Sequence, residues 1–417
     1  MKRLHYIIFF ILSAAVLSWV LPWIFSLCFT ERNREPFVAY SPLTDSFVVT
    51  EFAADGKGEA TDIYTIDPLT HTPLNHFTMD QRDSLLPEIF VGQLSAKGQL
   101  PDSIKGVEIN MREIRMNSWI FTSSPKDFNR AVPRVFPLME SMPARFKFED
   151  PSVVMTLNDD GLQITDIETN RNDAQKTARF AKMFADKGFA FPAIEAAANI
   201  TSRKGYDNGY LIIDADRKLY HLKMQAGRPS MARIELPDSI VPTHAYVFEN
   251  ADRQLYGLLS AKDGNMYAVN HDDTYSISKL SGISFDPTSE KMTIMKNLFS
   301  WCVKINSDDR TEWVALDPTT LSVMATYTYS YVSSLNRTVR QWIFPFVTTF
   351  TSTADRFVYP RIGDVSPRAL VLNALLALIV IFAAKGPDRR CTAGKFVVTL
   401  LLGLFAFIPL MLIKQVK

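Results

Sequence analysis

Long runs of apolar residues occur only at the two ends of the chain. Residues 6–29 carry no charged side chain, and at about 1.5 Å per residue a helix of this length spans roughly 36 Å, enough to cross the apolar core of a bilayer. The run is longer than the apolar part of a signal peptide, and no A-x-A cleavage site follows it. We therefore predict an uncleaved signal anchor over residues 1–30, with a cleaved signal sequence as the alternative.

Two further apolar runs near the C-terminus predict a helical hairpin over residues 367–417. They cover residues 369–384 and 396–413, and the first run needs the basic residues at its ends to extend toward the membrane surface. Two basic residues precede the N-terminal run and the hairpin loop is also basic, so the positive-inside rule places both in the cytoplasm. The loop, residues 385–395, is either a topology determinant alone or a contact for acidic lipid or a cytoplasmic partner.

Together the three apolar runs predict a multi-pass membrane protein with a cytoplasmic N-terminus and a large extracytoplasmic domain. Residues 332–366 form a juxtamembrane segment before the second run. Apolar residues in this segment recur at helical spacing and predict a helix that lies at the membrane interface or under the outer domain, and that Pro345 ends or kinks. The apolar residues at helical spacing are Leu335, Val339, Trp342, Phe346 and Phe350.

Residues 31–331 carry strand signals almost throughout, as short β-branched and aromatic runs separated by polar turns. The clearest stretch predicts four strands between residues 245 and 280, with turns such as Lys262-Asp263-Gly264 between them. Four antiparallel strands within about 40–45 residues are typical of one blade of a β-propeller. A propeller is therefore our first interpretation of this domain.

The same strand–turn–strand pattern recurs along the chain. An aromatic residue follows the turn at Tyr220, Tyr267 and Trp313, about 46–47 residues apart, which is the spacing of propeller repeats. A strand that ends in Asp-Pro-x-Thr occurs at residues 63–70 and again at residues 313–320. In this turn the aspartate accepts backbone hydrogen bonds and the proline presets the bend.

Copies of the pattern near residues 63, 115, 164, 219, 266 and 313 predict an all-β propeller of about six four-stranded blades, with five or seven also open. A pair of β-sandwiches or an irregular β-solenoid is the rival architecture. Residues 85–144 are the least regular part of the domain. Residues 173–187 have apolar positions at helical spacing, which predicts an inserted helix that packs on one propeller face.

Composition narrows the functional classes. The 417 residues include 45 basic and 44 acidic side chains, for a net charge of +1, which argues against nucleic-acid binding because phosphate neutralisation requires clustered Lys and Arg. No phosphate-binding loop, zincin helix, nucleophile elbow or paired-cysteine metal motif is present, so we expect no catalytic residue and no cofactor. The three cysteines, Cys28, Cys302 and Cys391, fall in different compartments and predict no disulfide.

One cluster has a metal-like composition. His71, His76 and Met79 offer imidazole and thioether groups of the kind that copper accepts, but their spacing matches no rigid site, and we assign them a structural or surface role. His271 stands beside Asp272 and Asp273, where acid–base chemistry is conceivable. Polar side chains at a hairpin tip are expected on solvation grounds alone, so we predict no site there either.

The layout of one N-terminal anchor, a β-rich outer domain and a C-terminal hairpin with an Arg-Arg loop resembles an uncharacterised bacterial membrane-anchored family of unknown function, encoded beside ABC-transporter genes. The resemblance covers the whole chain and implies no site residue. It implies a non-enzymatic accessory subunit that joins an ABC permease and its ATPase, with the propeller as a binding platform. A stand-alone membrane-anchored ligand-binding or sensor protein is the alternative, and a membrane-tethered hydrolase or lyase is the second.

Overall fold

The computed structural model describes residues 2–29, 35–53, 59–67, 70–131, 134–145, 147–331, 335–383 and 389–412. The chain divides into two compact units. The first, which we call the helical unit, contains Met1–Glu35, Phe52–Glu59 and Ser330–Lys417. The second, which we call the β unit, contains Pro36–Glu51 and Ala60–Tyr329.

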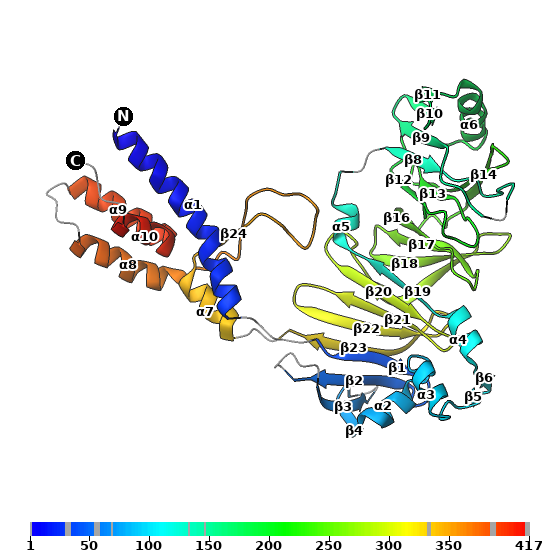
Figure 1. Cartoon of the computed structure of the whole chain (residues 1–417), viewed down its shortest axis with the longest axis horizontal. Helices are drawn as coiled ribbons and strands as arrows, with labels where there is room; N and C mark the ends of the chain where they lie inside the picture. Colours follow the sequence, from blue (N-terminus) through cyan, green and yellow to red (C-terminus); the bar gives the residue numbers. More distant parts are fainter. Residues whose placement is uncertain are drawn as a thin grey trace. The chain divides into compact units, whose positions relative to one another are not determined.

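Five sheets of four or more strands make up most of the described β unit, and Figure 1 shows them in sequence colours. In the first four sheets, spatial order follows chain order or its reverse, so each is a meander. Their strands are β1 (Phe37–Ser41), β2 (Ser46–Phe52), β3 (Ala60–Ile66) and β4 (Pro73–His76); β8 (Val135–Leu138), β9 (Val153–Asn158), β10 (Gly161–Asp166) and β11 (Arg171–Asn172); β12 (Glu195–Ala197), β13 (Tyr210–Ile213), β14 (Leu219–Gln225) and β15 (Arg228–Ile234); and β16 (Pro242–Val247), β17 (Leu255–Ala261), β18 (Asn265–Asn270) and β19 (Ile277–Ser284).

The fifth sheet has one strand that comes from far away in the sequence. Its meander consists of β20 (Lys291–Lys296), β21 (Trp301–Asn306), β22 (Arg310–Leu316) and β23 (Val323–Ser330). The additional strand, β7 (Trp119–Ser123), pairs antiparallel with β20, so that Trp119 lies opposite Lys296 and Ser123 opposite Met292. The fifth sheet therefore has the order β23-β22-β21-β20-β7.

Hydrophobic clusters between neighbouring sheets hold the β unit together. One cluster joins the second and third sheets through residues such as Met155 and Tyr220, and others join the third to the fourth, the fourth to the fifth and the fifth to the first. Strands in the middle of this stack are buried on both faces, as in the fully buried Tyr-Leu-Ile-Ile of β13. Among the described residues no such cluster joins the first sheet to the second, so these sheets do not form a closed propeller.

The prediction of a blade near residue 115 is wrong. That region forms short helices and a small hairpin instead: α2 (Met79–Leu85), α3 (Val91–Ala96), β5 (Ser103–Ile104), β6 (Val107–Glu108), α4 (Met111–Asn117) and α5 (Pro125–Phe128). Local capping explains the helices, because Thr78 and Gln81 form a capping box and the Asn110 side chain accepts a hydrogen bond from the backbone N–H of Glu113. The described residues therefore contain five sheets of four or more strands, and five was the lower of the alternative blade counts.

Turn chemistry repeats as the sequence predicts. The Asp317 carboxylate accepts hydrogen bonds from the backbone N–H groups of Thr319 and Thr320 at 2.9 and 2.8 Å, and Asp67 accepts one from the backbone N–H of Thr70 at 3.0 Å. Residues 68–69 of the first motif lie outside the described residues. The aromatic residues that follow the turns, Tyr220, Tyr267 and Trp313, are all buried.

An inserted helix, α6 (Ala174–Asp186), lies where the spacing predicts one, against β10 and β15. Its N-cap, Asp173, accepts a hydrogen bond from the backbone N–H of Lys176 at 2.9 Å. The side chains of Phe180 and Phe184 on this helix are fully buried. The helix completes the core of the second and third sheets.

The helical unit contains α1 (Lys2–Cys28), α7 (Leu335–Ile343), β24 (Val347–Thr349), β25 (Arg361–Gly363), α8 (Ala369–Ala383), α9 (Arg389–Leu402) and α10 (Leu404–Leu412). Among the described residues, α1 is the helix that is long and apolar enough to cross a membrane, and the apolar helices Ala369–Ala383 and Thr392–Leu402 are shorter. Helix α7 ends at Ile343, just before Pro345, as the sequence predicts. The predicted stripe is wrong at its last two positions, because Phe346 and Phe350 lie beyond the helix, on either side of β24.

The last apolar run is broken. Between α9 and α10, Gly403 has a φ of +56°, a conformation that favours glycine, and a Cβ there would lie 2.1 Å from Oδ1 of Asn373 on α8. The Asn373 side chain is fully buried and donates a hydrogen bond to the carbonyl of Leu400 at 3.0 Å. Residues 413–417 lie outside the described residues.

Candidate functional site

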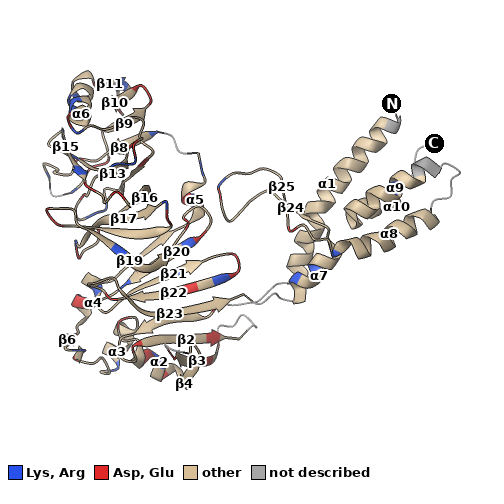
Figure 2. Ribbon diagram, turned by 180° about the vertical axis from the view of Figure 1, so that it is seen from behind, with Lys and Arg blue, Asp and Glu red and all other residues tan. Residues whose placement is uncertain are grey.

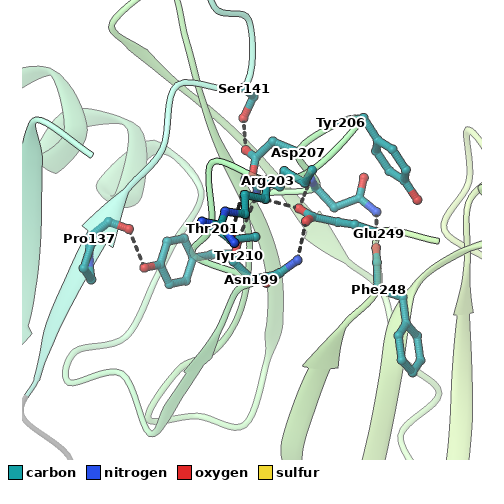
Figure 3. A network of polar contacts seen from close by, with 12 residues as sticks. Pro137, Ser141, Asn199, Thr201, Arg203, Tyr206, Asp207, Tyr210, Phe248 and Glu249 are labelled. Atoms are coloured by element: carbon teal, nitrogen blue, oxygen red, sulfur yellow. Dashed lines mark hydrogen bonds and ion pairs between the residues drawn. The ribbon is translucent and has the colours of Figure 1, made fainter. Parts of the chain in front are cut away.

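Two buried carboxylate sites stand out in the β unit. In the first, Nζ of Lys204 contacts the carboxylate of Asp207 and lies 2.9 Å from Oε1 of Glu249. The three side chains are at most 3% exposed. Nζ also donates a hydrogen bond to the carbonyl of Asn199 at 2.7 Å. We call these contacts the Lys204 network, and Figure 3 labels Asn199, Asp207 and Glu249 among its members.

The Lys204 network ties loops of three sheets together. The backbone N–H of Asn208 and the side-chain amide of Asn199 each donate to Glu249 at 2.8 Å, and the Ser141 hydroxyl donates to Asp207 (Figure 3). Burial raises the pKa of Glu249, and the hydrogen bonds that it accepts from Lys204 and the two asparagines oppose that rise. Because the lysine and both acids already have hydrogen-bond partners within the protein, we assign this network a structural role.

A buried histidine extends the same network. Nε2 of His221 lies 2.6 Å from the carbonyl of Asn208, and Nδ1 lies 3.0 Å from the hydroxyl of Tyr275. The carbonyl only accepts, so Nε2 carries the proton and Nδ1 accepts from the tyrosine. Burial lowers the pKa of His221 to about 4, so the ring is neutral near pH 7.

Close backbone approach fixes the sheets on either side of the network. A Cβ on Gly257 would lie 1.8 Å from the carbonyl oxygen of Tyr246 and 2.8 Å from Leu211 of the neighbouring sheet. Gly209 follows the loop that carries Lys204, has a φ of +64°, and leaves no room for a Cβ beside the carbonyl of Leu222. These glycines and the charges indicate a structural role for this first site.

The second site is a cavity of about 320 Å³. Its walls come from strands of the first and fifth sheets, from the segment between α2 and α3, and from β7. The apolar lining is largely aromatic and aliphatic, and it includes Phe37, Ala39, Tyr40, Trp119, Ile120 and Met295. We call this space the Glu88 cavity.

Glu88 is the unusual member of the lining. The residue is 7% exposed, and neither carboxylate oxygen has a hydrogen-bond partner among the described residues. Burial raises the pKa of Glu88 to about 8, and its own backbone N–H offsets only part of that rise. A buried carboxyl group without a partner costs free energy of folding, which makes this residue a candidate for contact with a ligand.

The cation that also lines the cavity is already paired. Nζ of Lys296 lies 2.6 Å from Oδ2 of Asp252 and 2.9 Å from the side-chain oxygen of Gln254, and the indole N–H of Trp119 donates to the same Asp252 oxygen at 3.2 Å. Glu88 is therefore the acid of the lining that has no side-chain hydrogen-bond partner among the described residues. Small polar groups of Ser118, Asn297 and Ser300 complete the lining.

Cys302 on β21 lines the cavity as well and is 4% exposed. Burial raises the pKa of its thiol to about 12, so the thiol stays protonated and unreactive at neutral pH. Cys302 therefore packs as a small buried apolar side chain. Cys28 on α1 is exposed, and the Cys391 side chain lies outside the described part of the chain.

The residues with metal-like composition do not come together as a site. His76 on β4 pairs with Asp62, with 2.8 Å between Nδ1 and Oδ1, His71 lies in an exposed turn with a φ of +55°, and Met79 begins α2. No group of three or more His, Cys, Asp or Glu side chains in the described residues could hold a metal ion.

The acidic hairpin tip is a hydrogen-bonded turn. Asp272 accepts hydrogen bonds from Ser276 and Thr274, which lower the pKa of its carboxyl group to about 2. His271 stacks on the ring of Tyr256 with 4.2 Å between centroids. The start of the basic loop, residues 385–388, lies outside the described residues, and the remainder belongs to α9.

Sequence reasoning missed Glu88 and the Lys204 network. A signal for Glu88 exists, because it is the one charged residue in the apolar stretch Leu-Leu-Pro-Glu-Ile-Phe over residues 85–90. Lys204 and Asp207 gave no such signal, since a polar loop with mixed charges is usually solvated.

Comparison with known proteins places the chain in a family. No curated protein matches it. Three solved structures overlap with it: the propeller of Dos1 (9% identity, TM-score 0.28, 52% of this chain and 64% of that one), the β-propeller domain of Cps50 (Swd1) from Myceliophteria thermophila (12%, 0.25, 49% and 57%) and the WD40 domain of SCAP from fission yeast (8%, 0.24, 78% and 78%).

The overlap spans less than two thirds of the first two of these chains, and the scores are too low to carry an argument about this fold. The assignment to a strand-rich β domain therefore rests on the hydrogen-bonded sheets described above. A sequence family covers the same region: residues 37–316 match the family described as a domain of unknown function, DUF4857. The chain belongs to this family.

Proposed function

We propose that the protein is a non-enzymatic accessory subunit of a transport complex in the bacterial inner membrane. In this proposal the helical unit docks on a permease within the bilayer, and the β unit is an extracytoplasmic platform that holds a partner or substrate. The ABC-transporter assignment within the proposal rests on the resemblance in layout. The docking assignment rests on the surface of the helical unit.

The supporting observation is the apolar surface that the helices leave exposed. Only 17% of the most apolar 18-residue window of α1 is buried, which is unlike a core helix of a water-soluble domain. Figure 2 shows few charged residues on α1, α8 and α10. Exposed apolar side chains include Leu4, Ile8, Phe9 and Leu12 on α1 and Val371, Leu375, Ile379 and Phe382 on α8.

The contacts inside the helical unit favour docking over simple anchoring. Helix α1 packs against α10, and α8 packs against α9. The buried Asn373 amide bonds the backbone of α9 where α9 and α10 meet, and polar bridges of this kind join helices within membranes. One apolar helix would be enough to anchor the β unit, so the additional helices support a second role in the bilayer.

A gentle detergent purification of the tagged full chain, followed by mass spectrometry, tests the proposal. We expect recovery of a permease and an ATPase in amounts comparable to the chain. Phe382→Ala, on the exposed face of α8, should lower that recovery, whereas Ile167→Ala removes an exposed apolar side chain of the β unit and should not. Recovery of the chain alone would overturn the proposal and favour a self-contained ligand-binding or sensor protein.

Single cysteines test the predicted topology. In a variant without the three native cysteines, Asp216→Cys, in the turn between β13 and β14, should react with a membrane-impermeant maleimide in intact spheroplasts. Arg389→Cys, at the start of α9, should react only after lysis. The opposite pattern would place the β unit in the cytoplasm.

A further inference from the structure

The Glu88 cavity combines features that together define a class of ligand. The carboxylate oxygens of Glu88 lack partners, the walls are mainly apolar, and the volume of about 320 Å³ is in the range of small-molecule sites. From this geometry we infer that the cavity binds a small organic cation, such as a primary amine with an apolar or aromatic body. The inference does not depend on docking of the helical unit.

Charge favours a cation over an anion or a neutral molecule. Glu88 is an acid without a counter-ion, while the nearby Lys296 is neutralised by Asp252 at 2.6 Å. An anion entering the cavity would therefore meet an uncompensated carboxyl group. An ammonium group would instead supply the hydrogen bonds that both oxygens of Glu88 lack.

The walls favour an organic cation over a metal ion. Calcium and magnesium take about six or more oxygen ligands, and the described residues offer no group of three or more acids, histidines or cysteines. The rings of Phe37, Tyr40 and Trp119 line the same space and can contact the body of an amine or the face of its ammonium group.

The irregular fold of residues 79–131 contributes several residues to the lining of the Glu88 cavity. In place of a regular blade, this segment supplies Glu88 from the connection between α2 and α3 and then adds β7 to the fifth sheet, which brings Trp119 and Ile120 to the opposite wall. Irregular segments on a regular scaffold are common locations for binding residues. The energetic cost of burying an unpaired acid is offset when a cation binds it.

Calorimetric titration of the purified full chain in detergent with phenethylamine tests the inference. We expect saturable binding with one site per chain at pH 8. The neutral analogue 2-phenylethanol, which has the same ring and chain length, should bind at least about tenfold more weakly because it cannot pair with the carboxylate. Equal binding of the amine and the alcohol, or no binding of the amine, would overturn the inference.

The variant Glu88→Gln keeps the shape of the side chain and removes its charge. It should weaken phenethylamine binding at least about tenfold and leave 2-phenylethanol binding unchanged. Glu195→Gln is the matched control, because Glu195 on β12 is another largely buried carboxyl group that does not line the cavity. Unchanged amine binding in Glu88→Gln would contradict the inference.

The pH dependence gives a second readout that does not need the variant to fold. A primary amine stays cationic below about pH 9, so only the carboxyl group changes charge between pH 6 and pH 8. With a pKa of about 8 for Glu88, affinity for phenethylamine should fall roughly fiftyfold from pH 8 to pH 6. An affinity that does not change over this interval would show that the amine binds elsewhere.

Discussion

Two buried glutamates of the β unit have opposite surroundings. Glu249 accepts hydrogen bonds from Lys204, Asn208 and Asn199, whereas Glu88 accepts none from a described residue. Both carboxyl groups are almost fully removed from water, so burial costs both of them free energy. The difference is that the fold itself compensates Glu249 and leaves Glu88 uncompensated.

This contrast separates a structural site from a binding site. The Lys204 network joins loops of the second, third and fourth sheets, and its lysine and both of its acids have partners within the protein. The Glu88 cavity lies where the regular stack gives way to residues 79–131, and its charge is free to meet a ligand. Changes to the first site should therefore affect stability, while changes to the second should affect binding and pH dependence.

The largest effect is expected from Lys204→Met. This change leaves Asp207 and Glu249 as two acids buried side by side, and removal of one partner of a buried ion pair typically destabilises a protein by about 3–5 kcal/mol. Urea denaturation of the full chain in detergent, followed by circular dichroism of the strands, measures the loss.

Lys218→Met is the matched control for that measurement. Nζ of Lys218 lies 3.0 Å from Asp216 in an exposed turn, and exposed pairs contribute about 0–1 kcal/mol. If both lysine variants lost the same small amount, the Lys204 network would not be the structural site that we describe.

The next effect is the pH dependence that Glu88 imposes on stability. Burial raises its pKa from 4.5 to about 8, so between these values the folded state holds a proton that the unfolded chain has released. The free energy of unfolding should therefore fall as pH rises, by about 2.5 kcal/mol from pH 5 to pH 7 for this one group. In Glu88→Gln this decline should be absent when urea denaturation is repeated at each pH.

Asp272→Asn tests the sign of that argument. Hydrogen bonds from Ser276 and Thr274 hold the pKa of Asp272 at about 2, below its unfolded value, so its contribution to stability is lost as pH falls. This variant should change the pH dependence in the direction opposite to Glu88→Gln. A shift in the same direction would contradict the assignment of a raised pKa to Glu88.

The sequence predicts the repeated hairpins because their signals are local. The turn before Tyr267 and the aspartate of residue 317 each act within a few neighbouring residues, so their spacing reveals the repeat. The packing of the fifth sheet on the first and the pairing of β7 with β20 depend on contacts between residues more than 160 positions apart. Trp119 and Lys296 are one such pair. No local pattern specifies such contacts, which explains the incorrect blade near residue 115.

The sequence did not predict either of the two glutamate sites, and the reason is the same for both. The sequence around Lys204 is typical of a solvated loop. Its burial depends on Glu249, which comes from a loop of the neighbouring sheet. Glu88 stands out among apolar neighbours in the sequence, but the cavity around it exists only after the first and fifth sheets and β7 have assembled. Burial, and not residue type, distinguishes both from ordinary surface charges.

A smaller effect is expected from His221, whose ring is hydrogen-bonded to Asn208 of the Lys204 network. Burial lowers its pKa to about 4, so between pH 6.5 and pH 4 the unfolded chain binds a proton that the folded state does not. Stability should therefore fall as pH falls, by about 2 kcal/mol at pH 5, and His221→Gln should remove that decline. NMR titration of the ring, assigned by its absence in the variant, checks the pKa directly. A ring that titrates near pH 6.5 would show that the site is open to water.

The smallest effect is expected from Ser141→Ala, which removes one hydrogen bond to Asp207 and leaves Lys204 in place. A hydrogen bond to a charged, buried acceptor contributes about 1.5–3 kcal/mol, and the remaining ion pair should limit the loss to about 1 kcal/mol. Ser276→Ala removes a comparable hydrogen bond to the exposed Asp272, where water replaces the hydroxyl, and should cost less. If the two serine variants were equally stable, Asp207 would be solvated, and the contrast between the compensated and uncompensated glutamates would lose its physical basis.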